Sequence, residues 1–186
     1  PFHVAYEVAE ECCSQAKDRA KEKDNMDICK VAGDVQVERV LNFVDFQLCK
    51  NVQATDLAAV REKEYKTASG EMLCIRPYYI PTEADFTDKN EEKSFSFVKL
   101  KEAIRYFTEE KNIPRSFAKK LRNTYALGEN KMLLLQNFLG SRGWKMPDGS
   151  NESYFGEETR IASWYDALEL MDLYAESEGA EEGDEQ

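Results

Sequence analysis

Apolar residues near the beginning of the chain follow the spacing of an amphipathic helix over residues 3–22. They recur at every fourth position, which places their side chains on one face of a helix. These residues are Val4, Val8, Cys12 and Ala16. The polar stretch over residues 21–27 ends the pattern. Residues 1–30 are therefore predicted to form an N-terminal arm or the first helix of the core.

Two further helices are predicted in the first third of the chain. Residues 35–49 carry a helical stripe of apolar side chains, and Asp34 precedes them as a suitable N-cap. The stripe consists of Val37, Val40, Leu41, Val44 and Leu48. The next helix is predicted over residues 55–66, with Thr55 or Asp56 as its N-cap.

The helical pattern is interrupted at Ser69 and Gly70, a pair that is typical of turns. Residues 72–80 are rich in aliphatic and aromatic side chains, which is typical of β-strands. Pro77 lacks the N–H group that a central strand needs. The stretch 70–80 is therefore predicted to form a short hairpin or an edge strand, which a polar loop follows.

Four helices are predicted in the second half of the chain. The first spans residues 97–110, and the second begins at Pro114, a residue that suits a first helical turn. The buried faces are predicted to consist of Phe97, Leu100, Ile104 and Phe107 in the first helix, and of Phe117, Leu121 and Tyr125 in the second. A third helix over residues 129–139 is expected to stop at Gly140, and the last helix spans residues 157–175.

These elements indicate a mainly α fold, a compact helical domain with a small β-hairpin. The predicted division is an N-terminal arm or helix over residues 1–30, a helical core domain over residues 31–176 and a disordered acidic C-terminal tail over residues 177–186. With 186 residues, of which 42% are hydrophobic, the chain can bury a core of ordinary size. No apolar run approaches the roughly 20 residues that a membrane span needs, so no membrane partner is expected.

The net charge of −11 conceals a basic middle between acidic flanks. Residues 99–145 hold eleven Lys or Arg against four Glu, a net charge of +7. Residues 146–186 hold one Arg against thirteen acids, a net charge of −12, which leaves −6 for residues 1–98. The basic segment favours an acidic partner, such as a nucleic acid or an acidic protein.

Residue types that often carry catalysis or bind metals are scarce. The chain has five cysteines without the short spacings of a zinc site, and its one histidine, His3, lies near the beginning. No glycine-rich loop follows a predicted strand, so the usual phosphate cradle of nucleotide-binding enzymes is not recognisable. We therefore predict no catalytic residue, no metal site and no cofactor, and a function in binding or assembly.

One charged residue departs from the pattern of the last predicted helix. Asp166 lies in an apolar stripe, four residues from both Ala162 and Leu170. An ionised carboxylate buried there is strongly penalised unless a cation meets it. Arg122 is the best candidate, because it lies beside an apolar stripe itself and because arginine keeps its charge when buried. We predict a buried Arg122–Asp166 pair, and the alternative is that both side chains face solvent.

Two short segments carry a resemblance to a known family. Residues 120–126 read KLRNTYA, and residues 163–167, around Asp166, read SWYDA. The first segment resembles the LR…YA motif, and the second the aromatic-Asp motif, of coat (capsid) proteins of flexuous filamentous plant RNA viruses, the potyvirus, flexivirus and closterovirus-like coats. In that family, the arginine and the aspartate form a buried pair. The chain departs from the family at Ala167, where another aromatic residue is usual.

The resemblance implies a structural coat protein that polymerises into a helical filament around single-stranded genomic RNA, bound without sequence specificity in an internal groove. It implies identical subunits as partners, with the N-terminal arm docking on a neighbour, and a location in the virion and the host cytoplasm. The expected RNA-binding residues are Ser94, Ser96, Arg115, Lys119, Lys120 and Arg122. The two serines are the nearest equivalents of a family serine close to the RNA, and the cations suit contacts with phosphates.

Two other classes of protein remain as alternatives. The main one is an intracellular helical adaptor or regulatory domain, whose basic face binds an acidic protein partner. Cations between apolar residues are typical of any solvated helix face, and aromatic residues at helical spacing usually belong to a core. The other class, an enzyme, is disfavoured by the scarcity of catalytic residue types. Rods or discs of the purified protein would favour the coat protein, and a small particle would favour the adaptor.

Overall fold

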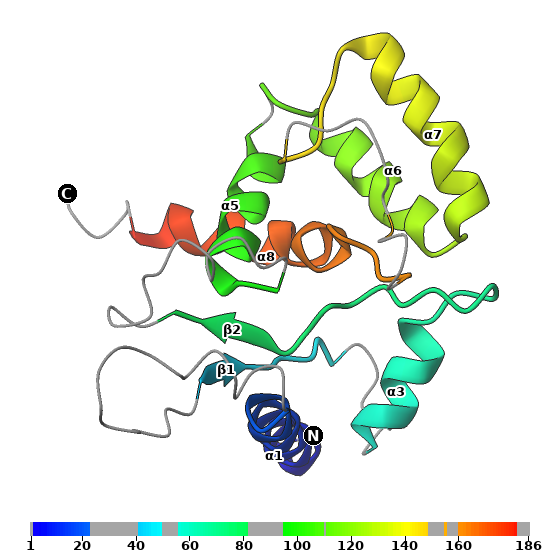
Figure 1. Ribbon diagram of the computed structural model, residues 1–186. Helices are drawn as coiled ribbons and strands as arrows, with labels where there is room; N and C mark the ends of the chain where they lie inside the picture. The colour runs from blue at the N-terminus through cyan, green and yellow to red at the C-terminus, as the bar shows by residue number, and fades with distance from the viewer. Residues whose placement is uncertain are drawn as a thin grey trace, which may run out of the picture. The chain divides into compact units, whose positions relative to one another are not determined.

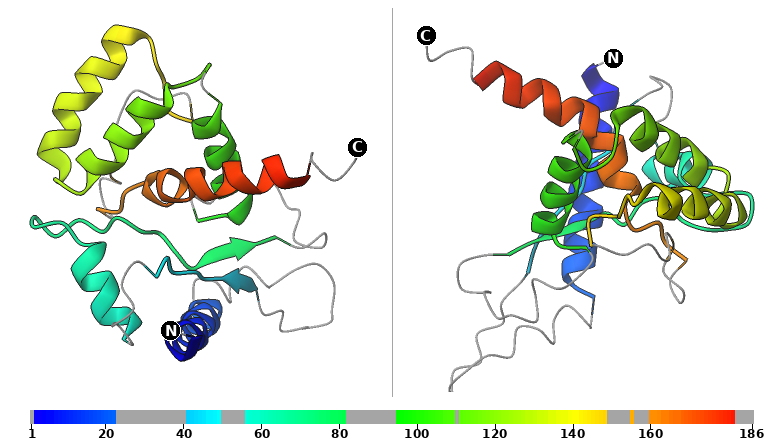
Figure 2. Two further views of the ribbon diagram at one scale, coloured as in Figure 1. Left: turned by 180° about the vertical axis from the view of Figure 1, so that it is seen from behind. Right: turned by 90° about the horizontal axis from the view of Figure 1, so that it is seen from above.

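Six helices and two short strands make up the part of the chain that the structure describes (Figure 1; Figure 2). The computed structural model describes residues 2–22, 41–49, 56–81, 95–109, 111–148, 155 and 160–181. The two strands pair in one antiparallel sheet. The predicted fold class, mainly α with a small β element, is confirmed.

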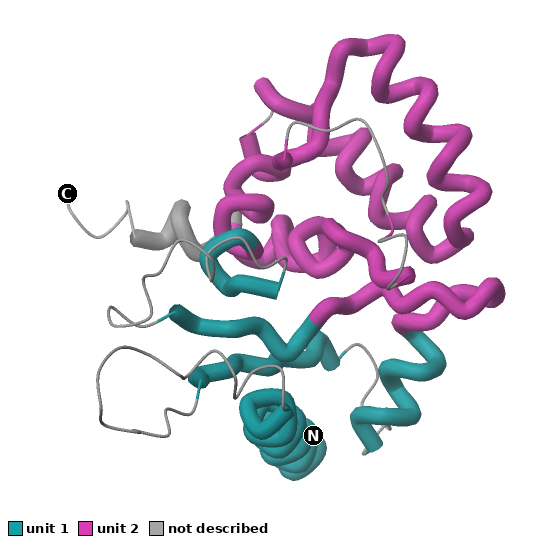
Figure 3. Tube along the Cα trace, viewed as in Figure 1, with its two compact units in different colours: residues 1–64, 76–99 teal, residues 65–75, 100–186 magenta. Residues whose placement is uncertain are grey.

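The chain folds as two compact units, which Figure 3 shows in different colours. Unit 1 contains residues 1–64 and 76–99, and unit 2 contains residues 65–75 and 100–186. The predicted division was an N-terminal arm or helix over residues 1–30 and one helical core domain over residues 31–176, whereas the structure divides the residues of that core between two units. In the structure, the N-terminal helix belongs to the same unit as the sheet.

Helix α1 (Phe2–Ala20) forms in unit 1 because its apolar residues share one face, as predicted. Its buried residues include Val4, Val8, Cys12 and Ala16. The helix packs against β1 (Asn42–Val44) and α3 (Leu57–Glu64). Burial raises the pKa of the Cys12 thiol to about 11, so this sulfur stays protonated and behaves as a small apolar group.

Two carboxylates cap the beginning of α3, the helix that was predicted over residues 55–66. The backbone N–H of Ala59 donates to Asp56 Oδ1 over 3.1 Å, which is the N-cap arrangement predicted for Asp56. The backbone N–H of Leu57 donates to Glu11 Oε2 of α1 over 2.6 Å. The first turn of α3 is thereby attached to α1.

Strand β1 pairs with β2 (Tyr78–Ile80) in antiparallel register. Phe43 stands opposite Tyr79, and their ring centroids are 5.9 Å apart. The ring of Phe43 also stacks on the ring of Phe95, with 6.3 Å between centroids. The β element predicted to end at residue 80 is present, and its partner is β1 rather than an adjacent segment.

The helix predicted over residues 35–49 is wrong in its described part, residues 41–49, because this part contains β1. Aromatic and β-branched side chains such as Phe43 and Val44 fit a pleated strand, and the pairing with β2 overrides the helical spacing of the apolar residues. The predicted N-cap of that helix, Asp34, lies outside the described residues.

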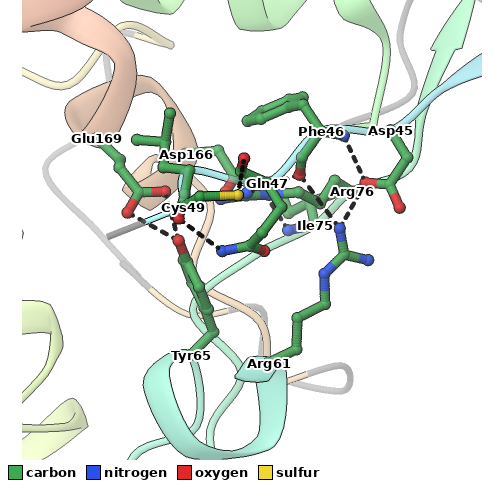
Figure 4. A network of polar contacts seen from close by, with 11 residues as sticks. Asp45, Phe46, Gln47, Cys49, Arg61, Tyr65, Ile75, Arg76, Asp166 and Glu169 are labelled. Carbon is green, nitrogen blue, oxygen red and sulfur yellow. Dashed lines mark hydrogen bonds and ion pairs between the residues drawn. The ribbon is translucent and has the colours of Figure 1, made fainter. Parts of the chain in front are cut away.

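Unit 1 contains a buried ion pair that links the segment after β1 to α3 (Figure 4). Arg61 Nη2 lies 2.7 Å from Asp45 Oδ1, and the side chains of these residues are 12% and 0% exposed, respectively. The same nitrogen donates to the carbonyl oxygen of Phe46 over 3.2 Å. Arg76 Nη1 donates to this carbonyl over 2.9 Å, and its guanidinium lies 4.3 Å from the Phe46 ring centroid. This pair was not predicted from the sequence.

Helices α5 (Phe97–Thr108) and α6 (Arg115–Tyr125) lie close to their predicted ranges. Pro114 takes the N-cap position of α6, immediately before the first helical turn. The predicted faces are buried at Leu100, Ile104 and Phe107 in α5, and at Phe117, Leu121 and Tyr125 in α6. Phe97, which was predicted to belong to the buried face of α5, is half-buried.

Helix α7 (Glu129–Arg142) is longer than predicted, because it continues through Gly140. It ends at Gly143, whose φ of 70° is the left-handed conformation that glycine adopts without strain. The N–H groups of Gly143 and Trp144 donate to the carbonyl oxygens of Gly140 and Leu139, over 3.1 and 3.3 Å. This pattern is a Schellman motif, which satisfies the last carbonyls of the helix.

Helix α8 (Tyr165–Glu181) begins eight residues later than predicted. The residues before it pair with another segment instead, since the backbone N–H of Ala162 donates to the carbonyl oxygen of Met72 over 2.8 Å. The helix extends into the range predicted for the acidic tail, and residues 182–186 lie outside the described residues.

Residues 65–75 of unit 2 are held by two acids of α8 (Figure 4). The phenol of Tyr65 donates to Glu169 Oε1 over 2.9 Å, and the backbone N–H of Ile75 donates to Asp166 Oδ2 over 2.9 Å. Both acids are almost fully buried. Because the two donors lie at the two ends of the segment, α8 anchors the whole segment.

Candidate functional site

One face of α6 gathers three cations around a carboxylate of α8. Helix α6 packs against α7 and α8 within unit 2, and α6 and α7 lie side by side in both views (Figure 1; Figure 2). Arg115, Lys119 and Arg122 are spaced by four and three residues, so they share one face of α6, named here the α6 cation face. Arg115 Nη2 and Lys119 Nζ lie 2.7 and 3.6 Å from Asp172 Oδ1. Arg122 Nη1 lies 3.8 Å from Asp172 Oδ2.

The α6 cation face is open to solvent and carries an excess of positive charge. The hydrogen bond from Arg115 lowers the pKa of Asp172, burial opposes this effect, and the charges of Lys119 and Arg122 lower the pKa further. The carboxylate is therefore ionised at neutral pH. Among the side chains that the structure describes, three cations meet this carboxylate, which leaves positive charge available to a ligand.

The structure corrects the predicted partner of Arg122. Its guanidinium lies beside Asp172 rather than Asp166, and its side chain is 30% exposed rather than buried. Asp166 is buried, as predicted, and accepts the backbone N–H of Ile75. The apolar surroundings of Asp166 thus indicated its burial correctly, but the Arg122–Asp166 pair does not form.

Of the two serines predicted to contact RNA, the structure describes one. Ser94 lies outside the described residues. Ser96 is fully buried and pairs through its backbone with Tyr79 of β2. Its hydroxyl has no hydrogen-bond partner among the described residues. The prediction of an RNA contact at Ser96 is therefore corrected, because the side chain is enclosed within the protein.

Lys120 lies against an aromatic cluster that sequence reasoning missed. Its Nζ is 5.5 Å from the ring centroid of Phe138, and the guanidinium carbon of Arg142 is 5.3 Å from the same centroid. The ring of Phe138 stacks on Phe117, with centroids 5.7 Å apart. Trp144 lies 4.9 Å from Phe117 and 6.4 Å from Phe138, centroid to centroid. These five side chains are named the aromatic-cation cluster.

Two spacings in the sequence signal this cluster in retrospect. Lys120 follows Phe117 by three residues, and Arg142 follows Phe138 by four, which are the spacings that bring side chains together on a helix. A cation near an aromatic ring is attracted to the ring face. Sequence reasoning assigned Phe117 to the core, which is confirmed, and overlooked Phe138, which is 40% exposed.

The basic character extends along both α6 and α7. Between residues 115 and 146 the sequence holds seven Lys or Arg against one acid, Glu129. Cations bind phosphates through charge, and exposed aromatic rings stack with nucleobases. Such an arrangement can bind single-stranded nucleic acid without reading its sequence.

A separate polar cluster around Glu71 serves the fold. Glu71 is almost fully buried and accepts hydrogen bonds from the side chains of Thr67 and Arg160. Burial raises its pKa, but hydrogen bonds from Thr67, Ser69, Arg160 and the backbone outweigh burial and lower the pKa to about 2. Gly128, with φ of 86°, packs closely here, since a Cβ at this position would lie 2.9 Å from Ser69 Oγ. The carboxylate is thus committed to internal contacts.

The described residues suggest no other site. Within them, no three His, Cys, Asp or Glu side chains are grouped so as to hold a metal ion. None of the helices in the described ranges has the length and apolar character of a membrane span. No family model, curated protein or solved structure matches this chain. Its function is therefore argued from the α6 cation face and the aromatic-cation cluster.

Proposed function

We propose that the protein is a coat protein that polymerises into a helical filament around single-stranded RNA, which it binds without sequence specificity in an internal groove. The observation that carries this proposal is the α6 cation face, where three cations of one helix share the carboxylate of Asp172. Surfaces of this kind bind nucleic acid because their Lys and Arg side chains replace the small cations condensed on the phosphates, and the release of those cations favours binding. The proposal includes a location in the virion and in the host cytoplasm.

Arg115, Lys119, Lys120 and Arg122 are the proposed RNA-binding residues. The stretch from Arg115 to Arg122 covers about 10 Å of helix at about 1.5 Å per residue, so a strand can run along α6. Long cationic side chains hold phosphates and carry no base information, which suits binding without sequence specificity. The excess of cations over acids along α6 and α7 supports the same role.

Exposed apolar residues support contacts between identical subunits. Leu133 and Leu134 are exposed on α7, and Phe2 and Tyr6 are exposed on α1. Apolar surface groups of this kind are typical of protein interfaces when they lie close together. We propose that α1 docks on a neighbouring subunit, and that head-to-tail contacts which do not close build the filament.

Electron microscopy of the purified protein, with and without single-stranded RNA, tests the proposal. Rods or discs that protect the RNA from nuclease are the expected result. A small particle that leaves the RNA fully digestible contradicts the proposal. That outcome favours the helical adaptor with an acidic protein partner instead.

Charge reversal on α6 tests RNA binding separately from folding. The double variant Lys119→Glu, Lys120→Glu is expected to weaken RNA affinity by at least about tenfold at low salt. The melting temperature should change little, because both side chains are exposed. Lys17→Glu with Lys63→Glu, two exposed lysines of unit 1, is the matched control with the same change in net charge. Equal losses of RNA affinity in the two variants would contradict a specific role of α6 and would show that RNA binding depends on net charge alone.

A further inference from the structure

The α6 cation face accounts for phosphates but leaves an exposed aromatic ring unexplained. Phe138 is 40% exposed on α7, although phenylalanine is among the residues most often buried. Its ring stacks on the buried ring of Phe117 and has Lys120 and Arg142 within 5.5 Å of its centroid. A ring that is packed on Phe117 and has two cations over it suits a ligand that is both flat and anionic, because the base can replace the cations on the ring while the phosphate pairs with them.

We propose that Phe138, backed by Phe117 and Trp144, is a stacking platform for a nucleobase of the bound single-stranded RNA. This inference rests on the proposed function and names the part of the RNA that the surface contacts. Every nucleobase has a π-face, so stacking adds affinity without selecting a sequence. The platform therefore complements the phosphate contacts of α6 without conferring specificity.

Neighbouring elements hold the platform in a fixed orientation. Trp144 packs on Phe117, with 4.9 Å between centroids and 55° between ring planes. Gly143 turns the chain at the end of α7, so that the N–H of Trp144 donates back to the carbonyl oxygen of Leu139. Because Phe117 and Trp144 are fixed before a ligand binds, little conformational freedom is lost on binding.

The charges around the ring favour a nucleotide over an apolar peptide. A base stacked on Phe138 brings its phosphate within reach of Lys120 and Arg142. Lys120 also follows Lys119 directly in the sequence, so the platform continues the α6 cation face. An apolar protein surface placed on Phe138 would instead desolvate these two cations without a counter-charge, which is costly.

A comparison of RNA with a polymer that lacks bases tests the platform. Oligouridylate of about eight nucleotides and an abasic oligonucleotide of equal length are titrated into the purified protein at low salt. The unaltered protein is expected to bind oligouridylate about tenfold more tightly than the abasic polymer. Phe138→Leu keeps an apolar side chain but removes the π-face. This variant should lower the ratio of the two affinities toward one, and its affinity for the abasic polymer should equal that of the unaltered protein.

Two controls separate stacking from a general effect on α7. Asn137→Ala changes an exposed residue of the same helix outside the aromatic-cation cluster, and it should retain the full ratio. The chain has two tryptophans, so Trp164→Phe leaves Trp144 as the only one. In that variant, oligouridylate should quench the fluorescence of Trp144, and the abasic polymer should not.

Several outcomes would overturn the platform. Equal affinity of the unaltered protein for both polymers would refute stacking and leave phosphate binding by α6 intact. An unchanged ratio in Phe138→Leu would also refute the stacking platform. If this variant in addition lost self-association, the ring of Phe138 would belong to a protein interface. Failure to bind either polymer would refute the proposed function and the platform together.

Discussion

Two aspartates, one in each unit, meet cations in opposite surroundings. In unit 1, the side chain of Asp45 is fully buried and pairs with Arg61, whose side chain is 12% exposed. In unit 2, Asp172 is partly exposed and shares its two oxygens among the members of the α6 cation face. The first contact matches one negative charge with one positive charge, whereas the second leaves cations in excess.

The comparison distinguishes an ion pair that stabilises the fold from ion pairs that reduce the positive charge of a surface. A buried charge that loses its partner is strongly destabilising, because no water replaces the partner. An exposed pair contributes only about 0–1 kcal/mol, because water and salt screen it. Asp45 therefore stabilises unit 1, whereas Asp172 sets how much positive charge α6 presents to a ligand.

The largest effect on stability is expected for Asp45→Ala, which leaves the guanidinium of Arg61 buried without its carboxylate. This variant should lose about 3–5 kcal/mol of the free energy of unfolding. Asp172→Ala should lose less than about 1 kcal/mol. Urea denaturation followed by circular dichroism measures both variants. Similar losses in the two would remove the distinction between the two aspartates.

Glu71 sharpens the comparison, because its carboxylate is buried while its partner Arg160 is half-exposed. The folded protein lowers its pKa from 4.5 to about 2. The stability that it adds is therefore fully present above about pH 4.5 and is lost as the pH falls through about 2. The total is on the order of 3 kcal/mol, at about 1.4 kcal/mol per pH unit.

Denaturation of the unaltered protein and of Glu71→Gln over this acidic range measures the contribution of Glu71. The unaltered protein should lose stability steeply, and Glu71→Gln should be less stable near neutral pH and depend less on pH. Glu129→Gln, which changes an exposed acid of unit 2, should keep the steep dependence. An unchanged pH dependence in Glu71→Gln would mean that other carboxylates govern acid unfolding.

The smallest effect on stability is expected for Asp172→Asn, which should change ligand binding instead. Removal of the negative charge that the three cations share should tighten RNA binding roughly three- to fivefold, since a charge at about 4 Å contributes about 1 kcal/mol in water. Glu129→Gln, with the same change in net charge, is the control. Filter binding measures the affinities. Weaker binding in Asp172→Asn would mean that the carboxylate positions the cations rather than offsets them.

Much of the helical fold was predictable, because a helix that buries one face reveals itself through local spacing. The recurrence of Val4, Val8 and Cys12 predicted α1, and the apolar face of α6 was predicted in the same way. Strand β1 was not predictable, since its apolar residues also fit a helical period. Only the pairing with β2, which lies far along the chain, decides between the two structures.

The candidate site was predictable only in part. The local excess of positive charge singled out Arg115, Lys119 and Arg122, which the structure brings together on α6. Asp172 was overlooked, because one more acid in an acid-rich segment has no distinguishing pattern. The burial of Asp166 was evident from its apolar neighbours. Its hydrogen bond to the main chain was not, since backbone donors leave no trace in residue type.

The hydrogen bond between residues 65–75 and α8 joins two residues, Ile75 and Asp166, that differ in how far they tolerate substitution. Asp166 accepts the main-chain N–H of Ile75, so replacement of the isoleucine side chain leaves this bond in place. Only proline at that position lacks the donor. At residue 166, by contrast, few side chains can supply the acceptor oxygen. As far as this bond is concerned, residue 75 can be any residue except proline, whereas residue 166 must keep a side-chain acceptor. Position 75 can therefore vary during evolution without loss of the bond to α8.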